Sequence, residues 1–140
     1  MAIVVDTNVL LSAAIADSKT RELVVNMDER LVAPEAIYRE IESYRGLIAE
    51  KSGLEDEEVE ELLDRLFKYI EILHEDEIDG HVEEAKQELA EVDEDDVIFL
   101  AAALAIDGVI WSDDSDLQEQ EVSEVYTTGE VIQEFYTDQI

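Results

Sequence analysis

The sequence contains no cysteine, which removes disulfide bonds, thiolate catalysis and cysteine-ligated zinc from consideration. It contains only one proline and five glycines among 140 residues. No stretch rich in glycine or serine divides the chain, and no internal repeat is visible. We therefore expect a single globular domain spanning residues 1–140, which is long enough to bury a substantial core.

Long hydrophobic runs are also scarce. The longest, at residues 97–106, is about half the length needed to cross a bilayer. The first residues lack the basic region and apolar core of a secretory signal. We expect a cytoplasmic protein that does not associate with membranes.

Basic residues are few: 9 stand against 39 acidic residues, for a formal net charge of -30. At ordinary salt such a surplus repels polyanions, which favours a protein that avoids nucleic acid. However, the acids are spread along the chain instead of forming a tail, a pattern typical of folded proteins that work in molar salt. There the Debye length is about 3 Å, so long-range repulsion is screened. The composition indicates a halophilic protein and leaves a nucleic-acid partner open.

Apolar periodicity predicts strands that alternate with helices, the pattern of an α/β sandwich with a mostly parallel five-stranded sheet. The apolar run at residues 97–106 is hydrophobic on all sides, which predicts a buried central helix closed by Asp107 and Gly108. Residues 35–51 place Ile37, Ile41, Tyr44 and Ile48 on one stripe of a helix. The predicted strands are residues 2–5, 31–33, 70–73, 109–111 and 125–127, and the predicted helices are 9–15, 18–27, 35–51, 55–69, 79–90, 97–106 and 129–138.

Two of the predicted strands end at acidic residues. Asp6 follows the first apolar run, and Thr7 and Asn8 after it offer side chains to hold its carboxylate. Asp114 and Asp116 follow the strand at 109–111 with alternate spacing, so both can turn to one side. In an open parallel sheet, ligands collect outside the carboxyl ends of the strands. Simpler roles are a helix cap for Asp6 and turn formation for the later acids.

Two more acids lie on predicted helices. Glu40 lies at the edge of the apolar stripe, about 60° from its centre, where a salt-bridge role is also open. Asp96 stands at the start of the buried helix and can project towards the sheet edge, with Asp93 as the helix cap. Several carboxylates that meet without a basic residue repel one another unless cations lie among them. Oxygen ligands suit Mg²⁺ or Mn²⁺, which can activate water against a phosphodiester.

With these motifs in view, the chain resembles the PIN-domain family of nucleases from residue 2 to about 134. The resemblance rests on residues 5–10, on Pro34 followed by Glu40 and Ile41, on residues 93–104, and on residues 111–116. It implies a parallel five-stranded sheet between helices and a Mg²⁺- or Mn²⁺-dependent endoribonuclease. The implied catalytic acids are Asp6, Glu40, Asp96 and Asp114, with Asp116 as a further metal ligand and Thr7, Asn8, Ser112 and Asp93 in supporting roles.

The compact prokaryotic members are most similar, many of them VapC-type toxins. The resemblance therefore implies an RNA substrate, a small antitoxin partner and a homodimer. The chain departs from the smallest toxins in its longer, more acidic region 35–90 and in its few basic residues, none of which follows Lys86. Basic contacts to RNA must come from the earlier part of the chain, for which the candidates are Lys19, Arg21, Arg39 and Arg45.

Other functions remain open at this level. A receiver-type signalling domain or a haloacid-dehalogenase-like phosphatase would require a late lysine, which the chain lacks. A catalytically weak metal-binding or interaction module would keep the acids without turnover. An RNA-processing nuclease that is not a toxin would share the same site.

Overall fold

Five strands form one sheet in the order β3-β2-β1-β4-β5, and every pair of neighbours is parallel. The computed structural model describes residues 2–15, 19–89, 94–118, 120 and 122–136. The sheet confirms the predicted α/β class and its five strands, and it is wholly parallel. The strands are β1 (Ala2–Val5), β2 (Arg30–Pro34), β3 (Ile70–Leu73), β4 (Val109–Trp111) and β5 (Val125–Tyr126).

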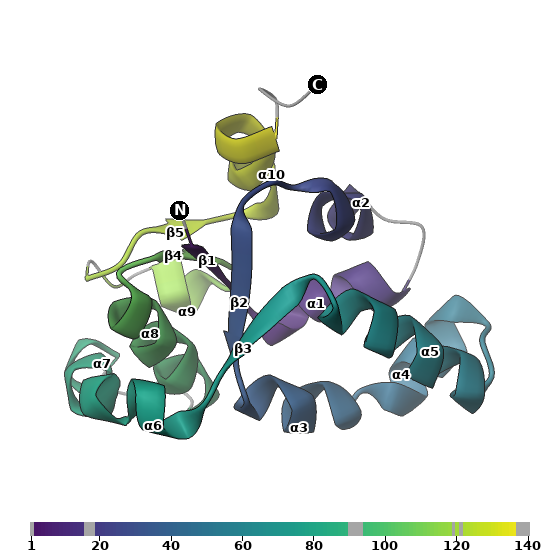
Figure 1. Ribbon diagram of the computed structural model, residues 1–140, viewed down its shortest axis with the longest axis horizontal. Helices are drawn as coiled ribbons and strands as arrows, with labels where there is room; N and C mark the ends of the chain where they lie inside the picture. Colours follow the sequence, from purple (N-terminus) through teal and green to yellow (C-terminus); the bar gives the residue numbers. More distant parts are fainter. Residues whose placement is uncertain (1, 16–18, 90–93, 119, 121, 137–140) are drawn as a thin grey trace.

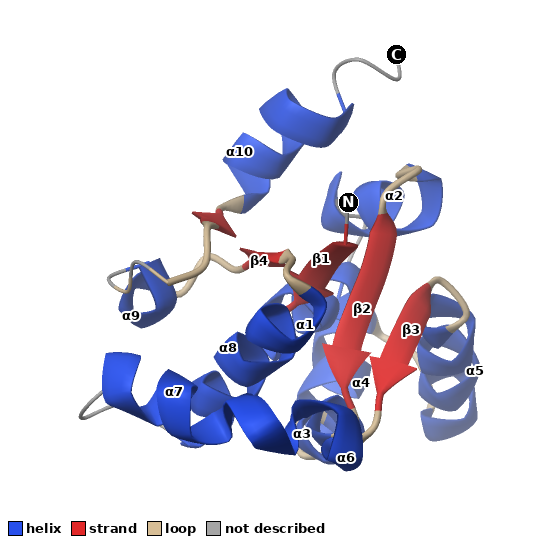
Figure 2. Ribbon diagram, turned by 60° about the vertical axis from the view of Figure 1, so that its left-hand side comes forward, coloured by secondary structure: helices blue, strands red, loops and turns tan. Residues whose placement is uncertain are grey.

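Helices cover both faces of the sheet, as Figures 1 and 2 show. The helices that follow β1 and β2 cover one face, and the helices that follow β3 cover the other. Right-handed crossovers between parallel strands require this arrangement. The first group comprises α1 (Thr7–Ile15), α2 (Lys19–Asn26), α3 (Ala36–Glu42), α4 (Arg45–Ser52) and α5 (Asp56–Phe67). The second comprises α6 (Glu75–Ile78), η1 (Asp79–His81), α7 (Val82–Glu88) and α8 (Glu94–Ile106). The remaining short helices are α9 (Ser115–Gln118), α10 (Thr128–Val131) and η2 (Ile132–Tyr136).

The core lies between the sheet and these helices. Helix α8 contacts β1, β2 and β4, and its Phe99 and Leu100 are fully buried. A helix with apolar residues on all sides must be enclosed, so the sequence pattern correctly predicted its central position. Within the described part of the chain, none of the helices has the length and apolar character needed to cross a membrane.

The helix expected over residues 35–51 is divided in two. Helix α3 ends at Glu42, and α4 begins at Arg45. Ser43 N–H and its hydroxyl both bond to the Glu40 carbonyl, at 3.2 and 2.6 Å, and this tightened turn redirects the chain. Tyr44, predicted to lie on the buried stripe, is therefore 36% exposed.

Smaller differences occur at other helix ends. In the range 79–90, where one helix is predicted, the structure has two short pieces, η1 and α7, and α6 precedes them. The left-handed residue after α8 is Asp107 (φ 51°), not the glycine that follows it. Aspartate tolerates this conformation because its short polar side chain can bond locally. Gly108 is needed for close approach instead, since a Cβ there would lie 2.5 Å from the Ala2 carbonyl oxygen.

Candidate metal centre

The acidic residues after β1 and β4 lie at the point where the order of the strands in the sheet reverses. From β1 the chain crosses to β2 and β3 on one side, and from β4 it continues to β5 on the other. Val5 pairs with Trp111 at the carboxyl ends of the two strands, so the next residues, Asp6 and Ser112, are neighbours. Ligands of open α/β sheets bind at this kind of switch point.

Asp6 is the central residue of the site and is only 4% exposed. One carboxylate oxygen, Oδ2, accepts a hydrogen bond of 2.7 Å from the Ser112 hydroxyl. The backbone N–H groups of Thr7 and Asn8 also donate to its carboxylate, and its carbonyl accepts from Val9 and Leu10 at 3.0 and 3.2 Å. Asp6 therefore does cap α1, the simpler role considered from the sequence, and it does so from a buried position beside β4.

Burial raises the pKa of the Asp6 carboxyl above its usual value of 3.8, and the nearby Asp114 carboxylate raises it further. The hydrogen bonds from Ser112 and from the first turn of α1 lower the pKa and partly oppose these effects. The repulsion indicates that the Asp114 carboxylate lies near the carboxylate of Asp6. A cation there would relieve both burial and repulsion.

Glu40 reaches the site through Thr7. The Thr7 hydroxyl donates a hydrogen bond of 2.9 Å to Glu40 Oε1, and the second carboxylate oxygen, Oε2, is buried. Thr7 directly follows Asp6 and is itself buried. The helix-edge position inferred for Glu40 thus places its carboxylate beside α1, one residue from Asp6.

Asp96 is the third residue of α8 and is 9% exposed. It stands at the end of α8 that precedes the buried Phe99 and Leu100, in a helix that contacts β1 and β4. A carboxylate that is this deeply buried in the first helical turn differs from the exposed acids of an ordinary helix start. Asp93 and the side chain of Asp116 lie outside the described residues.

Asp113 and Asp114, in the loop after β4, make different contacts. Ser112 Oγ donates to Asp6 and accepts the backbone N–H of Asp114 at 3.0 Å, which places Ser112 and Asp114 on the Asp6 side. Asp113 points elsewhere, and its two oxygens accept the Thr128 N–H and hydroxyl, each at 2.8 Å. Sequence reasoning did not identify Thr128. The signal was present in the Thr127-Thr128-Gly129-Glu130 capping box, which marks a helix start beside this loop.

The ligand atoms that these acids offer can be compared with those that a divalent cation prefers. Asp6, Glu40, Asp96 and Asp114 offer only oxygen ligands, and the buried Asp6 has a neighbouring carboxylate but no basic group among the causes of its shifted pKa. This chemistry fits Mg²⁺ or Mn²⁺. Among the described residues, no three acidic or histidine side chains are already gathered closely enough to hold one ion. The arrangement comprises Asp6 with Asp114 nearby, and Glu40 hydrogen-bonded to Thr7.

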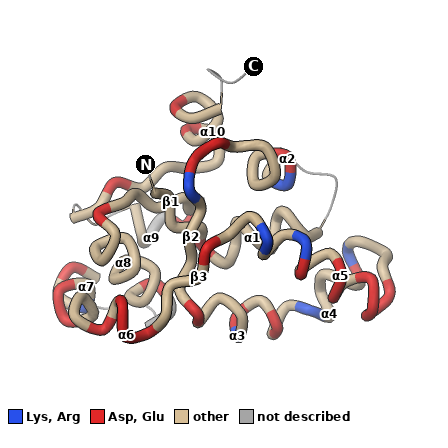
Figure 3. Tube along the Cα trace, viewed as in Figure 1, with Lys and Arg blue, Asp and Glu red and all other residues tan. Residues whose placement is uncertain are grey.

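The basic residues proposed for substrate contacts are engaged to different degrees. Arg21 donates to the Ala13 and Ala14 carbonyls at 2.7 and 3.2 Å, and Lys19 pairs with Glu22 at 3.2 Å. Arg45 pairs with Glu42 and Glu60, which joins α4 to α5. Arg39 is exposed and lines a cavity of about 300 Å³ with Pro34, Glu35 and Ile98 at the carboxyl end of β2. Figure 3 shows how few basic positions interrupt the acidic ones.

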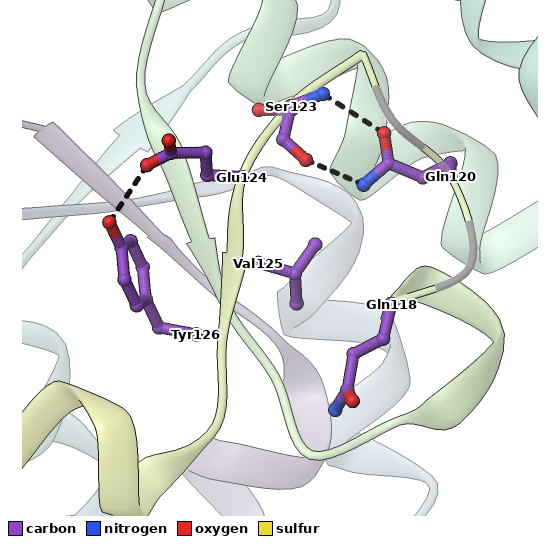
Figure 4. A pocket seen from close by; sticks show the side chains of 6 residues that line it. All are labelled: Gln118, Gln120, Ser123, Glu124, Val125 and Tyr126. Atoms are coloured by element: carbon purple, nitrogen blue, oxygen red, sulfur yellow. Dashed lines mark hydrogen bonds between the residues drawn. The ribbon is translucent and has the colours of Figure 1, made fainter.

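A second cavity, of about 350 Å³, is lined by residues between Gln118 and Tyr126. Figure 4 shows its lining, which belongs to the segment that leads into and forms β5. The Tyr126 hydroxyl donates to Glu124 at 2.7 Å, and this bond, together with burial and nearby carboxylates, raises the pKa of Tyr126 to about 12. Gln120 bonds to the backbone of Ser123 in the same region. None of the predicted site residues lines this cavity, so we do not assign the chemistry to it.

Comparisons with known proteins define the class. The profile of the PIN domain family matches residues 4–135, so the chain belongs to this family. Membership supports a nuclease activity. Comparison with curated proteins gave no match.

Solved structures share the fold at low sequence identity. A chain of VapBC2 from Rickettsia felis, bound to a DNA fragment from its promoter, superposes with a TM-score of 0.71 at 14% identity, covering 91% of this chain and 98% of that one. A toxin-antitoxin complex from Klebsiella pneumoniae gives 0.66 at 15% identity, covering 89% and 96%. A protein from Pyrobaculum aerophilum gives 0.66 at 12% identity, covering 95% and 88%. These likenesses confirm the PIN-like architecture.

Proposed function

We propose that this protein is a metal-dependent endoribonuclease that hydrolyses RNA phosphodiester bonds, and that it is the toxin of a toxin-antitoxin pair. The observation that carries the nuclease proposal is the buried Asp6 carboxylate, which lies near Asp114 at the switch point of a PIN-domain sheet. The acids proposed to bind Mg²⁺ or Mn²⁺ and to serve catalysis are Asp6, Glu40, Asp96 and Asp114, with Asp116 as a further ligand.

The bound cation would supply charge neutralisation on the phosphodiester and activation of water. The chain's own residues orient the acids for that task. Ser112 holds Asp6 Oδ2 in place, and the N–H groups at the start of α1 also bond to this carboxylate. Thr7 holds Glu40 Oε1. These hydrogen bonds limit the rotation of the Asp6 and Glu40 carboxylates.

For the substrate contacts we favour Arg39, which lies next to Glu40 in α3 and is exposed beside a cavity at the same edge of the sheet. Lys19, Arg21 and Arg45 remain candidates, although each already makes contacts within the chain. A chain this acidic should bind RNA best where salt screens long-range repulsion.

The nuclease proposal is tested with purified wild type and Asp6→Asn in molar KCl with MnCl₂ and a mixed RNA pool. Asp6→Asn should fold and lose cleavage, because it removes a charged ligand from the site. Asp28→Asn, at an exposed position, is the matched control and should cleave like wild type. Cleavage by Asp6→Asn at the wild-type rate would contradict the proposal. Stoichiometric Mn²⁺ binding without cleavage of any RNA would favour an interaction module instead.

The toxin role is supported by the shared fold, since the Klebsiella pneumoniae structure is a toxin-antitoxin complex. We expect a short antitoxin reading frame beside this one, and we expect growth arrest when the protein is induced without it. Co-expression of the neighbour should restore growth. Growth unaffected by induction of an active enzyme would point to RNA processing. We also propose a homodimer, to be checked by sedimentation at high salt.

A further inference from the structure

The loop that carries Asp114 is anchored on the side opposite to Asp6. Asp113 Oδ1 accepts the backbone N–H of Thr128 at 2.8 Å, and Asp113 Oδ2 accepts the Thr128 hydroxyl at 2.8 Å. Thr128 Oγ1 in turn accepts the indole N–H of Trp111 at 3.0 Å. Trp111, the last residue of β4, is fully buried, so one end of this chain of hydrogen bonds is fixed in the core.

The direction of these bonds is determined by the chemistry of the groups. An indole nitrogen can only donate, an ionised carboxylate can only accept, and a hydroxyl can do both. Thr128 must therefore pass its hydroxyl hydrogen to Asp113 while it receives the hydrogen of Trp111. Bonds to an ionised acceptor are roughly twice as strong as those between neutral groups. Valine at position 128 has neither a donor nor an acceptor in its side chain and cannot join Trp111 to Asp113.

The start of helix α10 does not depend on Asp113 for its cap. Thr127 Oγ1 accepts the Glu130 N–H at 3.2 Å, and the Glu130 carboxylate accepts the Thr127 N–H at 3.0 Å. This reciprocal pair is a complete capping box. The two bonds that Thr128 donates to Asp113 are additional, and their main effect falls on the loop between β4 and α9.

Consecutive residues of this loop face opposite directions. Ser112 Oγ donates to Asp6 and accepts the backbone N–H of Asp114, whereas Asp113 accepts from Thr128. We propose that Asp113 and Thr128 are positioning residues of the metal centre, which hold the Asp114 carboxylate towards Asp6. This inference rests on the proposed function. The start of α10 would then support the site through Thr128, although α10 supplies no metal ligand.

The test compares Thr128→Val, which keeps the side-chain shape without the hydroxyl, with Thr128→Ser, which keeps the hydroxyl. Mn²⁺ binding is measured by isothermal titration without RNA, and cleavage is measured separately in molar KCl. Thr128→Val should weaken Mn²⁺ binding roughly 10- to 100-fold, the usual effect of losing a group that orients a metal ligand. Thr128→Ser should restore binding to near the wild-type value. The KM for RNA should change little while kcat falls.

Two further measurements separate positioning from general loss of structure. Trp111 is the only tryptophan, so its emission in metal-free protein reports directly on the bond to Thr128 and should shift in Thr128→Val but not in Thr128→Ser. Asp113→Asn keeps an oxygen acceptor for the Thr128 N–H and should weaken Mn²⁺ binding even if Thr128→Val folds poorly. Asp28→Asn again serves as the control for loss of one exposed charge.

The outcomes distinguish this inference from the function on which it rests. If wild type binds Mn²⁺ and cleaves RNA, and folded Thr128→Val and Asp113→Asn do so with unchanged affinity and kcat, the positioning role is overturned and the nuclease proposal stands. If wild type neither binds Mn²⁺ nor cleaves RNA, both are overturned. Reduced affinity in Thr128→Val and Asp113→Asn, rescued in Thr128→Ser, supports the positioning role.

Discussion

Ser112 Oγ lies 2.7 Å from Asp6 Oδ2 and donates a hydrogen bond to it across 106 positions of the sequence. Both residues are buried, and they follow paired strands at the switch point of the sheet. This bond is the direct link between the first acidic motif and the last. It lowers the pKa of Asp6 against the effects of burial and of the neighbouring Asp114.

Ser112→Ala should destabilise the protein by about 1–3 kcal/mol at neutral pH, the usual cost of leaving a buried acceptor without its donor. Urea unfolding of wild type, Ser112→Ala, Asp6→Asn and the double variant forms a cycle that isolates the pair. We expect a clear coupling between the two positions. Strictly additive effects would show that the bond contributes nothing to stability.

The pKa of Asp6 predicts how stability depends on pH. Because burial raises the folded-state pKa above 3.8, the contribution to stability is full below the unfolded value and is lost as pH rises through the folded value. Without metal, Asp6→Asn should therefore gain melting temperature relative to wild type as pH increases from acid to neutral. Asp28→Asn should show no such trend. Mn²⁺ should stabilise wild type and leave Asp6→Asn unchanged at neutral pH, because ligands stabilise only the state that binds them.

Gly108→Ala should destabilise the junction of β1 and β4. A Cβ at position 108 would lie 2.5 Å from the Ala2 backbone oxygen and 3.1 Å from Ile106 Cδ1, and the backbone cannot give way as a flexible side chain would. We expect a loss of about 1–3 kcal/mol from overpacking. Gly46→Ala is the matched control, because nothing lies within 4 Å of its new Cβ and alanine favours the helix by up to about 1 kcal/mol. Equal stability of the two variants in urea would contradict this assignment.

The excess of acid predicts that stability increases with salt. Net charge of -30 destabilises the compact state by self-repulsion, and KCl screens it. The melting temperature should rise steadily between low and molar KCl, as measured by circular dichroism. A melting temperature that is independent of KCl would remove the halophilic interpretation and leave the composition without a physical account.

Much of the fold could be predicted from local patterns. The β-branched run before Asp6 and the all-round apolar run at residues 97–106 each have one stable environment, a buried strand and an enclosed helix. The break at Ser43 and Tyr44 could not be predicted, since the apolar spacing continues through it and only the tightened turn to Glu40 reveals it. The division of residues 75–88 into three short helices could not be predicted from the sequence either.

The sequence by itself determined which residue types were available: an oxygen-only set of acids at strand ends and helix starts, no cysteine, and few cations. These facts depend on composition and on short-range periodicity, which a chain carries before it folds. The tertiary structure alone decided which acids meet and in what role. Asp113 and Asp114 are adjacent and chemically identical, yet one bonds to Thr128 and the other lies near Asp6. That choice depends on partners 15 and 106 positions away from the loop, which only the packing of β1, β4 and α10 brings together.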